Sequence, residues 1–222
     1  AEYWLEQAEA SSRSTDVACY AAVLNAFARA ALPDAAEAVM MRISEPSLTC
    51  FNALLHAFAR SANPHKAEMY LARMREVKVH PDGISFNTLI GAHVRCGDTR
   101  KSREVLEDMK RSSVQPTART FVALGSSSER AGDWRSTLTL FNEMLALRIP
   151  PEQRAYAMLL SAYGNAKLHQ DAGKFFLRIP SQYQRDGLVR EAMWRCFGKA
   201  AAELFQETEK QGGERSRLKM RS

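Results

Sequence analysis

The stretch LTCFNALLHAFARSANPHKAEMYLARMREVKVHPD, residues 48–82, decides the fold because the same pattern starts again at Gly83, Ala118 and Gln153. Equivalent positions of these 35-residue units carry similar side chains. An aromatic residue recurs at Phe51, Phe86, Phe121 and Tyr156, and a large apolar residue recurs at Leu71, Leu106, Phe141 and Phe176. A fixed period of this length indicates stacked supersecondary units, none of which can bury its apolar face alone.

The apolar spacing within residues 48–82 predicts two helices. One helix face is marked at i, i+3, i+4 and i+7 by Phe51, Leu54, Leu55 and Phe58. The pattern breaks before Pro64, which suits the first turn of a second helix. A second amphipathic face follows at Ala67, Tyr70, Leu71 and Met74. Each unit is therefore predicted to be a helix hairpin.

The repeat divides the whole chain of 222 residues. Residues 1–16 match the second half of a truncated repeat, so we expect the chain to be a fragment of a longer array. Five repeats follow at 17–47, 48–82, 83–117, 118–152 and 153–187. Residues 188–209 form a predicted amphipathic capping helix, and residues 210–222 a basic, flexible tail. The prediction is an all-α, right-handed α-solenoid of stacked helix-turn-helix hairpins with a C-terminal capping helix.

The amino-acid composition limits the classes of function that the chain can have. Hydrophobic residues make up 45% of the chain, which excludes wholesale disorder. The formal net charge of +6 fits an anionic partner such as nucleic acid without requiring one. No run of 18 apolar residues occurs, so no membrane span is expected. The four cysteines lie far apart and the five histidines share no metal-ligand spacing, so we expect free thiols and no metal site.

Arginine recurs near the end of the predicted first helices, at Arg29, Arg60, Arg95 and Arg130. Stacking turns equivalent positions into a row, and a row of fixed cations suits a phosphate backbone. The alternative is that each arginine complements the dipole at the end of its own helix on a solvated face. The recurrence in four successive units favours the phosphate-binding interpretation.

Specific motifs add a family resemblance. The helix starts TCFNALL (49–55) and ISFNTLI (84–90) and the repeat ends VHPD (79–82) and VQPT (114–117) resemble the pentatricopeptide repeat family. The resemblance extends over residues 1 to about 180. Tetratricopeptide repeats are the most similar alternative, but their Trp, Leu-Gly and Tyr signature is absent.

The resemblance implies single-stranded RNA binding at one base per repeat. In the family, a base is read by the residue after the aromatic and the residue after the closing proline. The corresponding pairs here are Asn52 with Asp82 and Asn87 with Thr117. The first pair looks like the family's uridine-preferring combination, and the second is a weaker pyrimidine reader.

Other positions depart from the family pattern. Val122 and Ala21 stand where base-reading residues are expected and offer no hydrogen bond. The stacking position holds Ile84, which suits an apolar wedge, and Arg119, which could stack on a base or reach a phosphate. We therefore expect limited base reading supported by phosphate contacts.

These observations predict a non-catalytic pentatricopeptide repeat protein that binds single-stranded RNA in organellar RNA processing, stabilisation or translation. The alternative is a structural subunit of a large organellar assembly such as the mitochondrial ribosome, contacting ribosomal RNA and ribonucleoprotein proteins. The mitochondrion is the expected location, with the chloroplast or another plastid as the alternative. No cofactor is expected, because the zinc deaminase and nuclease signatures of the catalytic family branches are absent.

Overall fold

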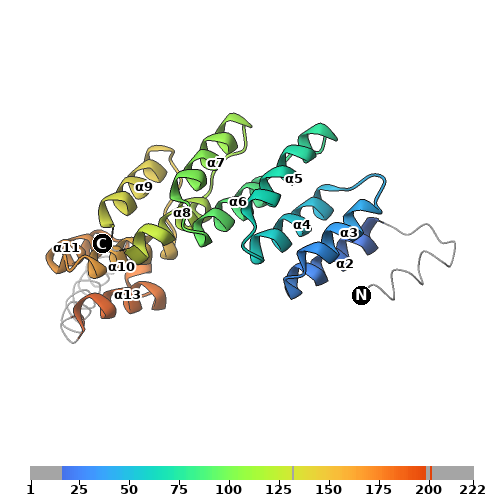
Figure 1. The fold of residues 1–222 in the computed structure, drawn as a ribbon. Helices are drawn as coiled ribbons and strands as arrows, with labels where there is room; N and C mark the ends of the chain where they lie inside the picture. Colours follow the sequence, from blue (N-terminus) through green and yellow to red (C-terminus); the bar gives the residue numbers. More distant parts are fainter. Residues whose placement is uncertain (1–16, 132, 199–200, 202–222) are drawn as a thin grey trace, which may run out of the picture. The chain divides into compact units, whose positions relative to one another are not determined.

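The computed structural model describes residues 17–131, 133–198 and 201, apart from the side chains of residues 130 and 131, and every regular element in this part is a helix (Figure 1). The helices are α2 (Val17–Ala30), α3 (Pro33–Met41), α4 (Leu48–Arg60), α5 (Pro64–Glu76), α6 (Gly83–Arg95), α7 (Thr99–Arg111), α8 (Ala118–Ala131), α9 (Trp134–Ala146), α10 (Gln153–Asn165), α11 (His169–Arg178), α12 (Ser181–Gln184) and α13 (Gly187–Phe197). Four first helices start where the sequence repeat starts, at Leu48, Gly83, Ala118 and Gln153.

The helices pair into hairpins within two compact units, Ala1–Pro116 and Thr117–Ser222. In the first unit, α2, α4 and α6 pack in succession, and each pairs with the helix that follows it, as Figure 1 shows. In the second unit, α8 packs against both α9 and α10, and α10 packs against α11 and α13. Each unit is therefore a stack of helix hairpins, as predicted for an α-solenoid.

Repeated apolar positions form the core of each unit. Phe51, Phe86 and Phe121 are fully buried, and so are the second-helix methionines Met74 and Met109. Burying one such side chain contributes about 1.5–3 kcal/mol relative to exposing it. The recurring aromatic and methionine positions are therefore the main source of cohesion between neighbouring helices.

The hairpin turns and repeat exits use a common helix-ending geometry. The backbone N–H of Asn63 donates to Phe58 O at 3.0 Å, and that of Val79 donates to Met74 O at 2.8 Å. The residue just before each donor is left-handed, with φ of 55° at Ala62 and 61° at Lys78. Glycine takes this conformation without strain at Gly97, where φ is 78°.

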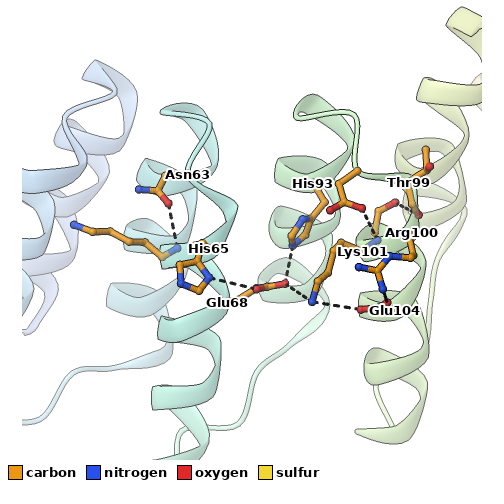
Figure 2. Close-up of polar contacts among 11 residues, drawn as sticks. Asn63, His65, Glu68, His93, Thr99, Arg100, Lys101 and Glu104 are labelled. Carbon is orange, nitrogen blue, oxygen red and sulfur yellow. Dashed lines mark hydrogen bonds and ion pairs between the residues drawn. The ribbon is translucent and has the colours of Figure 1, made fainter.

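A polar network joins neighbouring hairpins of the first unit, as Figure 2 shows around Glu68 of α5. The Glu68 carboxylate lies 3.0 Å from His93 Nε2 of α6. It also lies 3.7 Å from Lys101 Nζ of α7 and 3.9 Å from His65 Nδ1 of its own helix. His93 is buried and Glu68 is partly exposed, so this contact carries polar groups from the surface into the junction between α5 and α6.

Helix α13 covers the end of the second unit but is shorter than the helix predicted over residues 188–209. Val189, Met193 and Cys196 of α13 are buried, and the helix packs on α10. It ends at Phe197 because Gly198 adopts a φ of 54° and a ψ of −127°, which no right-handed helix accommodates. The predicted half repeat at 1–16 and the predicted tail at 210–222 lie outside the described residues.

Two glycines allow close approach of helices in the second unit. A Cβ atom at Gly125 of α8 would lie 2.3 Å from Met158 Sδ of α10. A Cβ atom at Gly164 of α10 would lie 2.3 Å from Cys196 Sγ and 3.3 Å from Cys196 Cα of α13. The contact at Gly164 includes backbone, so a side chain there cannot be accommodated by a rotamer change alone.

None of the described helices is both long and apolar enough to cross a bilayer.

We predict that Gly164→Ala lowers the free energy of unfolding by about 1–3 kcal/mol, because the added methyl group overpacks the α10–α13 contact. Gly91→Ala is the matched control, because its Cβ would meet Arg95 Nη1 at an ordinary 3.6 Å. In the interior of α6, alanine should stabilise the helix by up to about 1 kcal/mol. Urea unfolding followed by circular dichroism measures the free energy of unfolding of both variants. Equal changes in that free energy for Gly164→Ala and Gly91→Ala would contradict the packing argument.

Candidate nucleic-acid interface

The structure brings the first predicted base-reading pair together at the junction of α4 and α6. Asn52 Nδ2 donates to Asp82 Oδ1 at 3.2 Å. Asp82 is the N-cap of α6, and its Oδ1 also accepts from the backbone N–H groups of Ile84 at 3.0 Å and Ser85 at 2.9 Å. The helix cap therefore holds one member of the pair in place, and that member orients the other.

Ser85 completes this arrangement from within the core. Its hydroxyl donates to Asn52 Oδ1 at 2.6 Å and accepts from the backbone N–H of Asp82 at 3.2 Å. Asp82 and Ser85 thus form a reciprocal capping box. Sequence reasoning missed Ser85, although the spacing of Asp82 and Ser85 before an apolar run is itself a helix-start signal.

Hydrogen bonding keeps the Asp82 carboxylate ionised. Burial raises the pKa of Asp82, but bonds from the Ser85 backbone, the Asn52 amide, the Ser85 hydroxyl and the Ile84 backbone outweigh burial and lower that pKa below its ordinary value. An ionised carboxylate only accepts hydrogen bonds, so the group of Asn52 that faces it must be the amide nitrogen. Within the described residues, Asp82 Oδ2 and the second Nδ2 hydrogen of Asn52 carry no hydrogen bond, and both residues are partly exposed.

The second predicted pair is divided between the two units. Asn87 belongs to α6 of the first unit, and its buried Oδ1 has no hydrogen-bond partner among the described residues. Thr117 opens the second unit, where its backbone N–H donates to Thr120 Oγ1 at 3.0 Å. Each residue stands at a helix position equivalent to that of Asn52 or Asp82, and their pairing remains a prediction.

The predicted stacking residues project from the first turns of their helices. Ile84 of α6 is 62% exposed, although it is a large apolar residue. Arg119 of α8 is also exposed. Ile84 lies two residues beyond Asp82, so an apolar surface adjoins the polar Asn52–Asp82 pair.

Two members of the predicted arginine row are free to meet an anion. Arg29 and Arg60 are exposed in the last turns of α2 and α4. Partial desolvation lowers the pKa of the His56 imidazole, and the positive charges of Arg60 and Arg95 lower it further. The positive charges of Arg60 and Arg95 thus act on the same region at the ends of α4 and α6, where an anion would be favoured.

Arg95 has an additional structural contact. Its Nη2 donates to the carbonyl oxygen of Ala59 at 2.6 Å, in the last turn of the preceding first helix. Asn165 stands at the equivalent position of α10 and makes the equivalent bond, with Nδ2 donating to Glu129 O at 2.7 Å. This position therefore links two successive first helices, because its side chain bonds to a carbonyl in the last turn of the preceding one. The side chain of Arg130, the fourth member of the row, lies outside the described part.

The second unit presents a different surface at the base-reading positions. Val122 and Ala157 follow Phe121 and Tyr156, as Asn52 follows Phe51. Both line a hollow of about 260 Å³ whose walls also include Arg154 and Met158. No side-chain hydrogen bond is available from Val122 or Ala157, so these two positions cannot read a base edge.

No group of three potential metal ligands occurs in residues 17–131 and 133–198.

Comparisons with family models agree with this architecture. The model described as the pentatricopeptide repeat domain matches residues 44–97 and 104–166. A second model, described as the PPR repeat family, matches residues 81–124. No individual curated protein matches the sequence.

Solved structures share the fold at low identity. The pentatricopeptide repeat protein PPR10 in complex with an 18-nt psaJ RNA element aligns with a TM-score of 0.70 at 20% identity, over 86% of this chain and 28% of that one. PPR10 from maize gives a TM-score of 0.68 at 23% identity, over 96% and 31%. The PPR domain of Arabidopsis thaliana protein-only RNase P 1 in complex with tRNA gives 0.59 at 18% identity, over 84% and 95%. The chain thus spans less than a third of the length of PPR10.

We predict that Arg95→Ala lowers the free energy of unfolding by about 1 kcal/mol, because the Ala59 carbonyl loses a charged donor. Arg60→Ala is the matched control at the equivalent position, where no bond to a preceding helix is formed within the described residues, and should change stability by about 0.5 kcal/mol or less. Urea unfolding of both variants measures the difference. If Arg95→Ala loses no more stability than Arg60→Ala, the bond from Arg95 to the Ala59 carbonyl does not stabilise the fold.

Proposed function

This chain belongs to the pentatricopeptide repeat family, and we propose that it binds single-stranded RNA on the face formed by its first helices, without catalysing a reaction. The observation that carries this function is the Asn52–Asp82 pair, whose polar atoms lie 3.2 Å apart at a partly exposed helix junction. The pair keeps one N–H donor and one carboxylate oxygen unused, which together match the edge of a base. Solved relatives of the same fold contain a psaJ RNA element and a tRNA.

Cations at the C-terminal ends of the first helices, about 12 Å along the helix axis from this pair, supply the sequence-independent part of binding. Arg29 and Arg60 are exposed at the ends of successive first helices in the first unit. Each can neutralise a phosphate and release a counterion, which stabilises the complex most at low salt. Arg95 contributes less to phosphate binding in this proposal, because one of its guanidinium nitrogens already donates a hydrogen bond to Ala59 O.

Base selectivity belongs to the first unit in this proposal. Asn52 with Asp82 favours uridine and the Asn87 amide favours a pyrimidine, whereas Val122 and Ala157 accept any base. Ile84, with its exposed side chain, provides an apolar surface against which a base can stack. The RNA site is accordingly short and contains pyrimidines. The setting that we propose is organellar RNA processing, stabilisation or translation, in the mitochondrion or, as the alternative, a plastid.

A second candidate function is that of a scaffold in a large organellar assembly such as the mitochondrial ribosome. The hollow at Val122 and Ala157 favours it, because these two side chains offer no hydrogen bond to a base edge, whereas a side chain of a partner protein can pack against them. Sedimentation of an organellar extract distinguishes the two functions. A scaffold subunit should travel with ribosomal particles at low and high salt, whereas an RNA-processing factor should remain in the light fractions after nuclease treatment.

We predict that the double variant Arg29→Glu, Arg60→Glu binds uridine-rich single-stranded RNA more weakly than the wild type. The slope of log K against log salt should become shallower by about 1.4, because two phosphate contacts are lost. The control variant Arg73→Glu, Arg103→Glu makes the same charge change on α5 and α7 and should keep the wild-type slope. Fluorescence anisotropy at several salt concentrations measures both. Equal slopes for the two variants would mean that the charge of the whole chain, not the arginine row, attracts RNA.

A further inference from the structure

Ser85 contacts both residues of the proposed base-reading pair without reaching the surface itself. Its side chain is 0% exposed. Its Oγ lies 2.6 Å from Asn52 Oδ1 and 3.0 Å from Asp82 Oδ1. Ser85 therefore cannot touch RNA, and any effect that it has on recognition must act through Asn52 and Asp82.

The single hydroxyl proton of Ser85 has two acceptors within reach, Asn52 Oδ1 at 2.6 Å and Asp82 Oδ1 at 3.0 Å. Asp82 Oδ1 already accepts from the Ile84 and Ser85 backbone and from Asn52. Asn52 Oδ1 is the closer of the two acceptors. The hydroxyl of Ser85 therefore donates its proton mainly to Asn52. The hydroxyl also accepts from the backbone N–H of Asp82 at 3.2 Å. The hydroxyl is thus used in both directions, as donor and as acceptor.

This network selects one orientation of the Asn52 amide. In the reversed orientation, the amide oxygen would face the Asp82 carboxylate, and two acceptors would be in contact. The amide nitrogen would then face a hydroxyl that already accepts a backbone N–H. In the observed orientation of the Asn52 amide, each donor faces an acceptor. The second N–H of the amide, which is unused, then points away from Asp82 and Ser85.

We propose that Ser85 is a positioning residue for base recognition, whose buried hydroxyl holds the Asn52 amide in the orientation that presents its free N–H beside the Asp82 carboxylate. This inference rests on the proposed RNA-binding function. It assigns part of the selectivity to a residue outside the pair that faces the base. Thr120 shows that threonine fits the equivalent position of α8, because it is fully buried and its Oγ1 accepts from the Thr117 N–H at 3.0 Å.

The test compares binding of oligouridine and oligocytidine of about ten nucleotides by the whole chain. Ser85→Thr keeps the hydroxyl and Ser85→Val has the same shape without it, so this pair isolates the hydrogen bond. Ser85→Ala removes the hydroxyl without adding bulk. Ser102→Ala is the control, because Ser102 is buried in α7 and its hydroxyl donates to Thr99 O at 2.9 Å, far from the base-reading pair in the sequence.

We expect the wild type, Ser85→Thr and Ser102→Ala to prefer oligouridine. Ser85→Val, Ser85→Ala and Asn52→Ala should lose about threefold or more of that preference, the equivalent of one hydrogen bond. Thermal unfolding of each variant identifies any that fails to fold, and the Thr and Val variants then decide the question at a temperature where both are folded.

The outcomes separate this inference from the function on which it rests. If the wild type binds neither oligonucleotide, the RNA-binding function fails and the role of Ser85 fails with it. If the wild type binds both equally, or if Ser85→Val keeps the full preference shown by Ser85→Thr, RNA binding stands and the positioning role is overturned.

Discussion

Packing of successive first helices through their buried aromatic residues is the constraint on which the rest of the structure depends. Phe51 and Phe86 have no exposed surface, and each is the fourth residue of its helix. A hairpin alone would leave this face in water, at a cost of about 1.5–3 kcal/mol for each large apolar side chain. Stacking removes that cost and places equivalent residues of neighbouring repeats at regular intervals.

The close approach of these helices also creates the candidate interface. Asn52 directly follows Phe51, so the buried aromatic places the amide at the edge of the junction between α4 and α6. The N-cap of α6 then supplies Asp82 at 3.2 Å from the amide. Asp82 thus ends one repeat, caps the first helix of the next and orients Asn52, the predicted base-reading residue. The same junction near the other end of the helices brings Arg95 to the Ala59 carbonyl.

The two units share this construction but differ in what they expose. The first unit exposes the polar Asn52–Asp82 pair and the cations Arg29 and Arg60. The second exposes a hollow around Val122 and Ala157, with Arg154 among its walls. Since stacking depends on the buried residues, the exposed position after each aromatic is free to vary without loss of the fold. Different surfaces on one architecture are therefore compatible with the proposed RNA site in the first unit and a surface for another partner in the second.

The 35-residue period and the apolar spacing within it were sufficient to predict the hairpins and the starts of four first helices, because equivalent positions recur in a stacked array. The pairing of Asn52 with Asp82 came from the family resemblance. Contacts between repeats could not be predicted in this way. The bond from Arg95 to Ala59, the equivalent bond from Asn165 and the role of Ser85 depend on distances of a few ångströms across a helix junction. Gly125 reads as a weak helix former in the sequence, yet in the packed unit Met158 occupies the space that a side chain would need. Such contacts are decided when neighbouring helices pack, because local sequence carries no information about which atom of another repeat will be adjacent.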